Sequence, residues 1–596
     1  MQTYSAPLRD MRFLLHEVLD SGQISSLPGF QEATPDVFDA ILEEGAKFCE
    51  NQLLPLNRIG DEEGCTFENG LVRTPSGFKS AYEAFVKNGW HSIATNPDYG
   101  GQGLPEVLSF VFEEMVCSTN LAFGVYPLLS RGAATTIEAH ASEELKNTYL
   151  PHLGSGTWTG TMCLTESHCG TDLGLIRTKA EPNDDGTYKV SGTKIFITAG
   201  EHDLSDNIVH LVLAKLPDAP KGVKGISLFI VPKFLPGNDQ KIGQRNNVTC
   251  GSIEKKMGIH GSATCVLHFD EAKAWLVGKP HKGLSMMFTM MNGARLGVGL
   301  QGLGLGEVAY QSAASYAKER RQGKSIGEKS KAEDSADPII VHPDVRLMLL
   351  TAKALNEGAR ALAYKTAINI DIANKHGDPS ARKDADEYVQ LMTPVIKAFL
   401  TDNGSYAANL AVQVHGGHGY IREHGMEQFV RDARIAQIYE GTNGIQALDL
   451  VGRKLGVDMG RLLKHFFHPA SKFIEENKDN DDLRDLVKPL STSFNQLQQI
   501  TLLIAQRGLS DPEEAGAAAT DYLRAFGLVA VGHMWAEMAK TANGKIMNGY
   551  KGDKYYEEKI KTAEFYMKRV LPESAGLFLK IKSGKETLMA PSIESF

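Results

Sequence analysis

The sequence predicts an α+β chain of several domains, in which helical regions lie on both sides of a central β region. The 596 residues exceed the length of one ordinary domain. Apolar residues recur at helical spacing in the outer regions, whereas the central part carries short β-rich runs bounded by turns. A hydrophobic fraction of 42% and a charged fraction of 23% are typical of globular domains with apolar cores.

The change of pattern along the chain places the domain boundaries. We expect an N-terminal extension (1–34), an N-terminal helical domain (35–157), a central β domain (158–278), a second helical region (279–455) and an additional helical domain (456–596). In the last of these, Leu483, Leu486 and Leu490 begin a face that stays apolar over several turns. We find no internal repeat and no low-complexity tract.

The central region reads as strands with turns between them. The runs Tyr188–Val190, Lys194–Thr198, Ile208–Leu213 and Ile226–Val231 are rich in β-branched and aromatic residues. Between two expected strands, Asn183–Gly186 has the composition of a hairpin turn.

Composition and charge argue against several classes of protein. The net charge of −9 disfavours a nucleic-acid binder, which needs a basic face. The first residues lack a charged segment followed by an apolar run, and no uncharged apolar stretch approaches the ~18–20 residues of a membrane span. The seven cysteines form no CxxC pair, which favours reduced thiols. We therefore expect a cytoplasmic protein.

Three short motifs do not support the functions that their patterns suggest. Gly297–Gly302 fits GxGxxG, but a helical pattern precedes it, so we expect glycines at a close helix contact. Gly323–Gly327 fits GxSxG, yet it follows a helix where a nucleophile elbow needs a strand. His415, His418 and His424 lack a set of carboxylates or thiols to complete a metal site, so we expect none.

Two segments of the β region carry residues suited to a planar ligand. Met162–Asp172 offers main-chain donors and small hydroxyl groups beside a turn, and Gly192–Gly200 places Phe196 and Thr198 on one face of a strand. Taken singly, each is also compatible with ordinary strand packing.

Two further segments lie in the second helical region. Gln413–Tyr420 and Arg434–Gln446 contain glycines that let a main chain approach a ligand closely. Glu440 lies between Tyr439 and Gly441, where a helix gives way to a loop. A lone glutamate is usually a solvated surface residue, so its meaning depends on the other segments.

Read together, these segments resemble the acyl-CoA dehydrogenase family over residues 35–455. The similar stretches are MCLTESHCGTD, IFITAG, KERRQGKS, QVHGGHGY and IYEGTNGIQ, in the order found in the family. The family usually has Pro-Gly-Ala where this chain has Ser167, His168 and Cys169. The resemblance implies a helical N-terminal domain, a central β-barrel or sandwich, and a C-terminal helical bundle, here followed by an extra helical domain. That layout resembles the longer bacterial members, which act on 3-methylmercaptopropionyl-CoA or on medium- and long-chain fatty acyl-CoA.

The resemblance also implies FAD and a set of residues that hold it. These are Met162, Leu164, Thr165, Gly170, Thr171, Phe196 and Thr198 around the ring, and Arg320, Gln413, Gly416, Gly417, Thr442 and Gly444 along the dinucleotide. The family often has a larger polar residue at the position of Gly444. Within the second set, the residues implied to reach the flavin across a subunit interface are Arg320, Gln413, Gly416 and Gly417. A homodimer or homotetramer is therefore implied.

The implied reaction is α,β-dehydrogenation of an acyl-CoA thioester to trans-2-enoyl-CoA. Glu440 would remove the α-proton, flavin N5 would accept the β-hydride, and electrons would pass to an electron-transferring flavoprotein. The family's other base position corresponds to Ala294, which cannot take a proton, so Glu440 has no competitor there. The residues implied for the substrate are Thr171, Asn292, Arg295, Tyr439 and Gly441.

Two alternatives remain at this point. An acyl-CoA oxidase makes the same bond change but passes electrons to O2, and oxidases usually have Asp where this chain has Thr442. A non-catalytic family member that binds acyl-CoA would not need to keep Glu440 together with the flavin segments.

Overall fold

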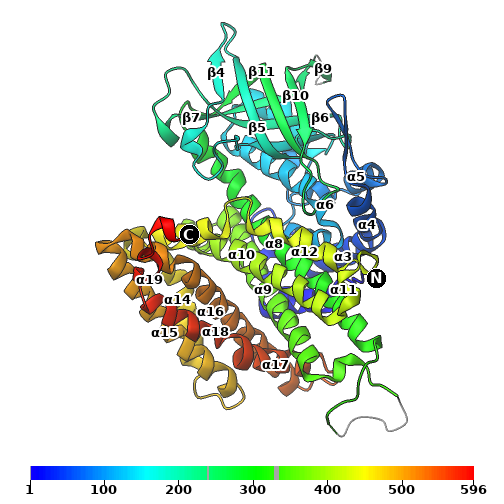
Figure 1. The fold of residues 1–596 in the computed structure, drawn as a ribbon, viewed down its shortest axis with the longest axis vertical. Helices are drawn as coiled ribbons and strands as arrows, with labels where there is room; N and C mark the ends of the chain where they lie inside the picture. Colours follow the sequence, from blue (N-terminus) through cyan, green and yellow to red (C-terminus); the bar gives the residue numbers. More distant parts are fainter. Residues whose placement is uncertain (1, 238–240, 328–334) are drawn as a thin grey trace. The chain divides into compact units, whose positions relative to one another are not determined.

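The computed structural model describes residues 2–237, 241–327 and 335–596. The chain divides into two compact units (Figure 1). The sheet unit comprises Lys47–Ser109 and Thr119–Gly297, and the helical unit comprises Met1–Ala46, Phe110–Ser118 and Val298–Phe596. Two long helices, α6 (Glu106–His140) and α8 (Gly283–Glu319), each contribute residues to both units.

The sheet unit is built on a seven-stranded sheet, drawn in cyan and green in Figure 1. Its strands are β3 (Trp158–Cys163), β4 (Lys179–Pro182), β5 (Tyr188–Thr198), β6 (Asn207–Lys215), β7 (Ile226–Pro232), β10 (Val248–Ile253) and β11 (Thr264–Val277). The order is β10-β11-β5-β4-β6-β3, and β7 pairs with both β11 and β6. This double pairing closes the sheet on itself, which confirms the predicted β-barrel-like central domain.

The sheet core follows from the residue pattern of the strands. Strands β6 and β7 are buried along almost their whole length, and both are rich in Val, Ile and Leu. Two runs that we expected as separate strands, Tyr188–Val190 and Lys194–Thr198, belong to the single strand β5. The expected turn at Asn183–Gly186 joins β4 to β5, with Gly186 at φ +81°.

Further elements complete the sheet unit. They are α4 (Leu54–Glu63), α5 (Phe78–Lys87), α7 (Glu143–Gly154), and the strand pairs β1 (Thr66–Glu68) with β2 (Leu71–Arg73) and β8 (Phe234–Pro236) with β9 (Ile242–Arg245). The N-terminal helical domain expected over 35–157 therefore contributes residues to both units.

The helical unit contains the chain's longest run of helices. These are α1 (Leu8–Arg12), α2 (Gly22–Ser25), α3 (Pro35–Phe48), α9 (Pro343–Lys375), α10 (Pro379–His415), α11 (Gly417–Tyr420), α12 (Met426–Arg434), α13 (Asn443–Asp449), α14 (Lys464–Asn477), α15 (Arg484–Ser510), α16 (Pro512–Met547), α17 (Tyr555–Phe565), α18 (Glu573–Lys582) and α19 (Glu586–Met589). Helix α16 packs on α9 and α10, and Trp535 on it donates a 3.0 Å hydrogen bond to the carbonyl of Ala354 on α9.

Glycines in α8 allow neighbouring helices to approach closely. A Cβ added at Gly302 would lie 2.5 Å from the carbonyl oxygen of Leu400, and one at Gly304 would lie 2.7 Å from the amide nitrogen of Ser118. Helix α8 runs through the whole GxGxxG match, Gly297–Gly302. The interpretation of these glycines as a close helix contact is therefore confirmed.

A buried charge network joins the N-terminal segment to the rest of the helical unit. Arg360 on α9 bonds to Asp10 at 2.7 Å, to Glu114 at 2.7 Å and to Glu307 at 2.9 Å. Asp10 also accepts from Lys559 on α17. The residues expected as an N-terminal extension thus contribute a charged side chain to the interior.

One described helix, α6, is long and apolar enough to span a membrane by length and composition alone. In its most apolar window, 89% of the residues are buried inside the protein. A buried core helix has the same features, so α6 is weak evidence for a membrane span.

Candidate active-site residues

Glu440 lies in a turn whose backbone adopts the left-handed conformation. A short helical turn, Ile435–Gln437, precedes it, and α13 begins three residues later. Glu440 has φ +55° and Gly441 has φ +85°. A non-glycine residue pays about 1–3 kcal/mol for such a conformation, which persists only where its surroundings hold it.

Polar side chains on both sides hold this turn in place. The side-chain amide of Gln446, 0% exposed, donates to the main-chain oxygens of Glu440 at 3.3 Å and Gly441 at 3.1 Å. The Thr442 hydroxyl caps α13 by accepting from the amide of Ile445. On the other side of the turn, the Tyr439 hydroxyl donates to Gln301 on α8, and burial raises the pKa of Tyr439.

Further side-chain hydrogen bonds join α13 to the neighbouring helix α10. The fully buried Lys397 donates to Asn443 Oδ1 at 2.9 Å, and the Asn443 amide donates to Asp402 at 2.7 Å. Asp402 also accepts from Gln437 at 2.7 Å, so one carboxylate joins the residues before and after Glu440.

In the sheet unit, the structure brings the two predicted β segments together. The amide of Ile195 donates to the carbonyl of Thr165 at 2.9 Å, and Lys194 Nζ donates to the carbonyl of Leu164 at 2.9 Å. The pairing of β5 with β11 is irregular here, and Phe196 adopts φ +58° with 59% of its surface exposed. Packing within the sheet does not explain an exposed aromatic ring on a strained strand, so Phe196 is a candidate for contact with a ligand.

A buried ion pair lies beneath this part of the sheet. Lys194, 0% exposed, bonds to Glu166 at 2.9 Å, and Glu166 also accepts from the Thr178 hydroxyl at 2.6 Å. Burial opposes ionisation of Glu166, but the charge of Lys194 and these hydrogen bonds outweigh it and lower its pKa to about 2. The pair fixes the start of the loop that carries Gly170 and Thr171, both of which are exposed.

The residues expected along the dinucleotide lie at helix ends. Gln413, Gly416 and Gly417 lie where α10 ends and α11 begins, and a Cβ added at either glycine would meet open space. Arg320 directly follows α8 and is exposed. Gly444 is exposed in the first turn of α13.

The expected substrate residues on α8 differ in burial. Asn292 is exposed, whereas Arg295 is buried, with its guanidinium 5.8 Å from the ring centre of Phe288. Both belong to the sheet unit, while Tyr439, Glu440 and Gly441 belong to the helical unit.

The histidines near the end of α10 pack with an aromatic ring. Tyr316 stacks on His415 at 4.2 Å between ring centres, and its hydroxyl shares a 2.9 Å hydrogen bond with His418 Nδ1. Within the described ranges, two groups of side chains are close enough to hold a metal ion. They are Glu166 with His168 and Cys169, and Asp384 with Glu387 and His465.

The sequence analysis did not identify the residues that support the Glu440 turn and the two β segments. Gln446 and Lys397 contact main-chain and amide groups, so no charge pattern or spacing marks them. Lys194 and Glu166 lie in the two quoted β segments, and a lysine in a strand beside apolar residues was a signal that could have been used.

Comparison with known sequences decides the family. Sequence models of the N-terminal, middle and C-terminal domains of acyl-CoA dehydrogenases match residues 36–157, 161–272 and 281–455. The chain belongs to the acyl-CoA dehydrogenase family. A further model, described as acetyl-CoA dehydrogenase C-terminal like, matches residues 466–592.

Relatives of acyl-CoA dehydrogenase type match the chain over its length. It is 42% identical to 3-methylmercaptopropionyl-CoA dehydrogenase of Ruegeria pomeroyi, over 99% of this chain and 100% of that protein. It is 32% identical to a broad-specificity linear acyl-CoA dehydrogenase of Mycobacterium tuberculosis, over 96% of each chain. The family consists of oxidoreductases that act on CH–CH bonds of acyl-CoA, and this acyl-CoA dehydrogenase is an enzyme of that class.

A solved structure has the same fold. The acyl-CoA dehydrogenase of Bacillus anthracis, complexed with FAD, matches 97% of this chain and 92% of its own, with a TM-score of 0.72 and 22% identity. The match extends to the helices that follow residue 455, so the extra C-terminal domain is part of a recurring architecture.

Proposed function

We propose that this dehydrogenase uses FAD to convert an acyl-CoA thioester to trans-2-enoyl-CoA, with Glu440 as the base that removes the α-proton. The observation that carries the proposal is the left-handed turn at Glu440, held by the buried amide of Gln446. A carboxylate placed by such a support has a defined direction, which general-base catalysis requires.

The residues assigned to FAD fit a bound dinucleotide with a flat ring. Phe196 offers an exposed aromatic face, and the open space at Gly416 and Gly417 admits a ligand close to the main chain. We assign the ring to Met162, Leu164, Thr165, Gly170, Thr171, Phe196 and Thr198, and the dinucleotide to Arg320, Gln413, Gly416, Gly417, Thr442 and Gly444. When bound, FAD supplies the acceptor for the β-hydride at N5.

Removal of the α-proton is assigned to groups of the protein itself. The α-proton of a thioester is weakly acidic, so its removal requires donors aimed at the enolate oxygen as charge develops. We assign one such donor to the main-chain amide of Glu440. The turn fixed by Gln446 then orients the donor and the carboxylate together.

The binding of acyl-CoA is assigned to Thr171, Asn292, Arg295, Tyr439 and Gly441. The 42% identity to 3-methylmercaptopropionyl-CoA dehydrogenase makes 3-methylmercaptopropionyl-CoA the first substrate to test. We further propose an electron-transferring flavoprotein as acceptor, a homodimer or homotetramer as the active form, and a cytoplasmic location.

The test is an anaerobic titration of the purified enzyme, followed by its visible spectrum. We expect bound flavin to bleach with 3-methylmercaptopropionyl-CoA or with saturated fatty acyl-CoA of particular lengths. A protein that holds no flavin, or flavin that no acyl-CoA in the panel reduces, would overturn the proposal. One equivalent of peroxide per turnover in air would favour an oxidase, although Thr442 occupies the position where oxidases usually have Asp.

A further inference from the structure

Asp402 on α10 bonds to both ends of the segment that carries Glu440. Its Oδ1 oxygen accepts a 2.7 Å hydrogen bond from the side-chain amide of Gln437 and another, also of 2.7 Å, from that of Asn443. The segment from Gln437 to Asn443 has seven residues, and Glu440 is the central one. One carboxylate oxygen therefore closes this segment into a loop, with the residue that we assign as the base at its middle.

Two cations set the direction of the amide groups that meet at Asp402. Arg434 donates to Gln437 Oε1 at 3.1 Å, and Lys397 donates to Asn443 Oδ1 at 2.9 Å. A side-chain amide accepts through its oxygen and donates through its nitrogen, so a cation bound to the oxygen leaves the nitrogen for an acceptor. An ionised aspartate only accepts, and its charge strengthens the bonds that it receives. The order cation, amide, carboxylate, amide, cation is thus complementary at every contact.

The part of α10 that makes these contacts is itself held by packing. Lys397 and Thr401 are both 0% exposed, and Thr401 also accepts from the Asn443 amide at 3.0 Å. Helix α8 lies close on this stretch, since a Cβ added at Gly302 would be 2.6 Å from the Cα of Thr401. Because a close-packed helix resists displacement, Asp402 is a fixed point for the loop.

Asp402 and Gln446 act on different parts of the loop. Gln446 bonds to main-chain oxygens at its centre, whereas Asp402 bonds to side chains at its two ends. Joining the ends of a short segment removes many of its conformations. Glu440, with φ +55°, adopts a conformation that persists only where the surroundings restrict the chain in this way.

We propose that Asp402 is a positioning residue for the dehydrogenation. By closing the Gln437–Asn443 loop, it holds the carboxylate of Glu440 in the direction needed to remove the α-proton. Asp402 acts through the loop and takes no proton itself. The inference rests on the proposed function, in which Glu440 is the base.

Replacing Asp402 by leucine removes both hydrogen bonds and keeps a side chain of similar size. In the flavin-loaded, full-length enzyme, we expect the limiting rate of flavin reduction by acyl-CoA to fall about tenfold or more. Asp402→Asn keeps an oxygen that accepts both bonds without the charge, so its rate should lie in between, about threefold below the parent. Parental rates in Asp402→Leu would overturn the proposal. If Asp402→Leu does not retain FAD, a parental rate in Asp402→Asn overturns it instead.

A double substitution separates the positioning of Glu440 from a general loss of structure. The Glu440→Gln enzyme has no base to position, so adding Asp402→Leu should slow its residual rate by less than about twofold. The same fold loss in both backgrounds would show that Asp402 does not act through Glu440. Parental turnover in Glu440→Gln would refute the proposed function, whereas parental turnover in Asp402→Leu beside a slow Glu440→Gln refutes this inference alone.

Hydrogen exchange measured by mass spectrometry tests the loop without a substrate. We expect the main-chain amides of residues 437–443 to exchange about tenfold faster in Asp402→Leu than in the parent, because the ends of the loop are released. Unchanged exchange would mean that the loop is fixed without Asp402, and the proposal would be wrong.

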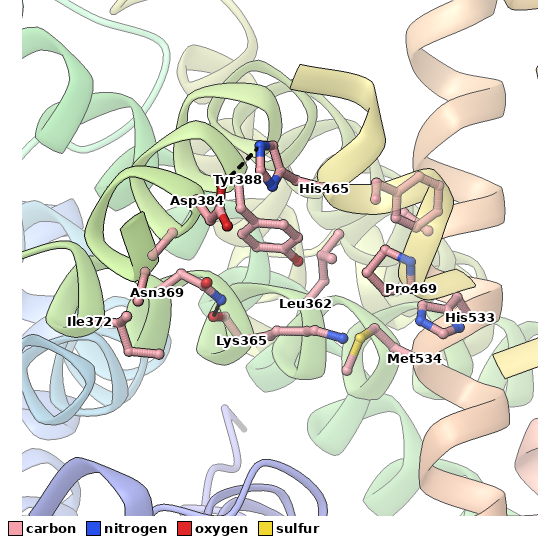
Figure 2. A pocket seen from close by; sticks show the side chains of 14 residues that line it. Leu362, Lys365, Asn369, Ile372, Asp384, Tyr388, His465, Pro469, His533 and Met534 are labelled. Carbon is pink, nitrogen blue, oxygen red and sulfur yellow. Dashed lines mark hydrogen bonds and ion pairs between the residues drawn. The ribbon is translucent and has the colours of Figure 1, made fainter. Parts of the chain in front are cut away.

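Asp384→Leu is the matched control for both measurements. Asp384 is an aspartate of the same helix, and its side chain is 58% exposed. Figure 2 shows its carboxylate directed toward His465, 4.0 Å away, beside a cavity of about 390 Å³ among α9, α10, α14 and α16. We expect this variant to keep the parental rate of flavin reduction and the parental exchange of residues 437–443. A loss in Asp384→Leu as large as that in Asp402→Leu would assign the effect to α10 as a whole and contradict the proposal.

Discussion

The side-chain amide of Gln446 donates to the main-chain oxygen of Glu440 at 3.3 Å, across a single turn of chain. The same amide donates to Gly441 at 3.1 Å, and the side chain is fully buried. Because Glu440 is a non-glycine residue with positive φ, these bonds hold a conformation that it does not readily adopt by itself. Gln446 therefore positions the residue that we assign as the base.

Replacing Gln446 by methionine removes the donors while keeping a side chain of similar length. We expect flavin reduction by acyl-CoA to slow about tenfold to hundredfold, because a small displacement of the base is costly in rate. The KM is expected to rise as well, because the same amide holds Gly441, which we assign to acyl-CoA binding.

Stopped-flow measurement of flavin reduction checks this expectation. Gln390→Met is the matched control, because Gln390 is an exposed glutamine of α10. Parental rates in Gln446→Met with intact FAD content would show that the hydrogen bonds to Glu440 and Gly441 are not needed for catalysis.

Replacing Glu440 by glutamine tests the base itself. The substitution keeps the size and polarity of the side chain but removes its ability to take a proton. We expect turnover to fall by about 10²–10⁴-fold or more, the range of general-base contributions, with FAD content and acyl-CoA binding retained. The readouts are steady-state turnover and the spectral shift of flavin on substrate binding. Undiminished turnover in Glu440→Gln would remove Glu440 from the mechanism.

The buried pair of Lys194 and Glu166 gives a prediction about acid stability. The pKa of Glu166 is lowered to about 2 in the folded protein, below the ordinary value of 4.5. A lowered pKa means that the unfolded chain binds the proton more readily. The stabilisation from Glu166 is therefore complete above about pH 4.5 and is lost as pH falls toward 2.

Urea unfolding at pH 7 and at a series of pH values from about 4.5 down toward 2 measures this effect. Glu166→Gln is expected to reduce the free energy of unfolding at pH 7 and to flatten its fall with acid. Lys194→Met removes the cation beside the buried carboxylate of Glu166 and is expected to cost about 3–5 kcal/mol at pH 7. Lys179→Met, at an exposed lysine of the adjoining strand β4, serves as the control. An unchanged pH profile in Glu166→Gln would assign the acid sensitivity to other groups.

Features marked by glycine in the sequence could be predicted, whereas side chains that bond to main-chain carbonyls could not. Glycine spacing and helical context identified Gly297–Gly302 as a helix contact, because a dinucleotide turn needs a strand before it. The loop at Glu440 was also predictable, since glycine follows it directly. The role of Gln446 was not, because its partners are main-chain carbonyls and only the fold reveals their direction.

The charge network around Asp10 could not be predicted from the sequence, because its members lie far apart along the chain. Asp10 precedes Arg360 by 350 residues and Lys559 by 549 residues, so no local pattern connects them. Its segment was expected as an extension, yet Met11 and Phe13 beside it are fully buried.

Replacing Asp10 by asparagine should therefore destabilise the helical unit. Asp10 accepts from Arg360 at 2.7 Å and from the Tyr555 hydroxyl at 2.9 Å, besides its contact with Lys559. Burial opposes its ionisation, but the charges of Lys559 and Arg360 outweigh it and lower the pKa of Asp10. Without the carboxylate, these buried cations lose a partner, and we expect a loss of about 3–5 kcal/mol.

Thermal and urea unfolding of Asp10→Asn measure this loss. Asp36→Asn, at an exposed aspartate in the first turn of α3, is the matched control and should change stability little. Because the pKa of Asp10 is lowered on folding, its contribution is present at neutral pH and disappears in acid, so the difference between Asp10→Asn and the parent should shrink as pH falls. A difference that is absent at pH 7 would mean that Arg360 is held by Glu114 and Glu307 alone, and that the N-terminal segment is attached only by apolar packing.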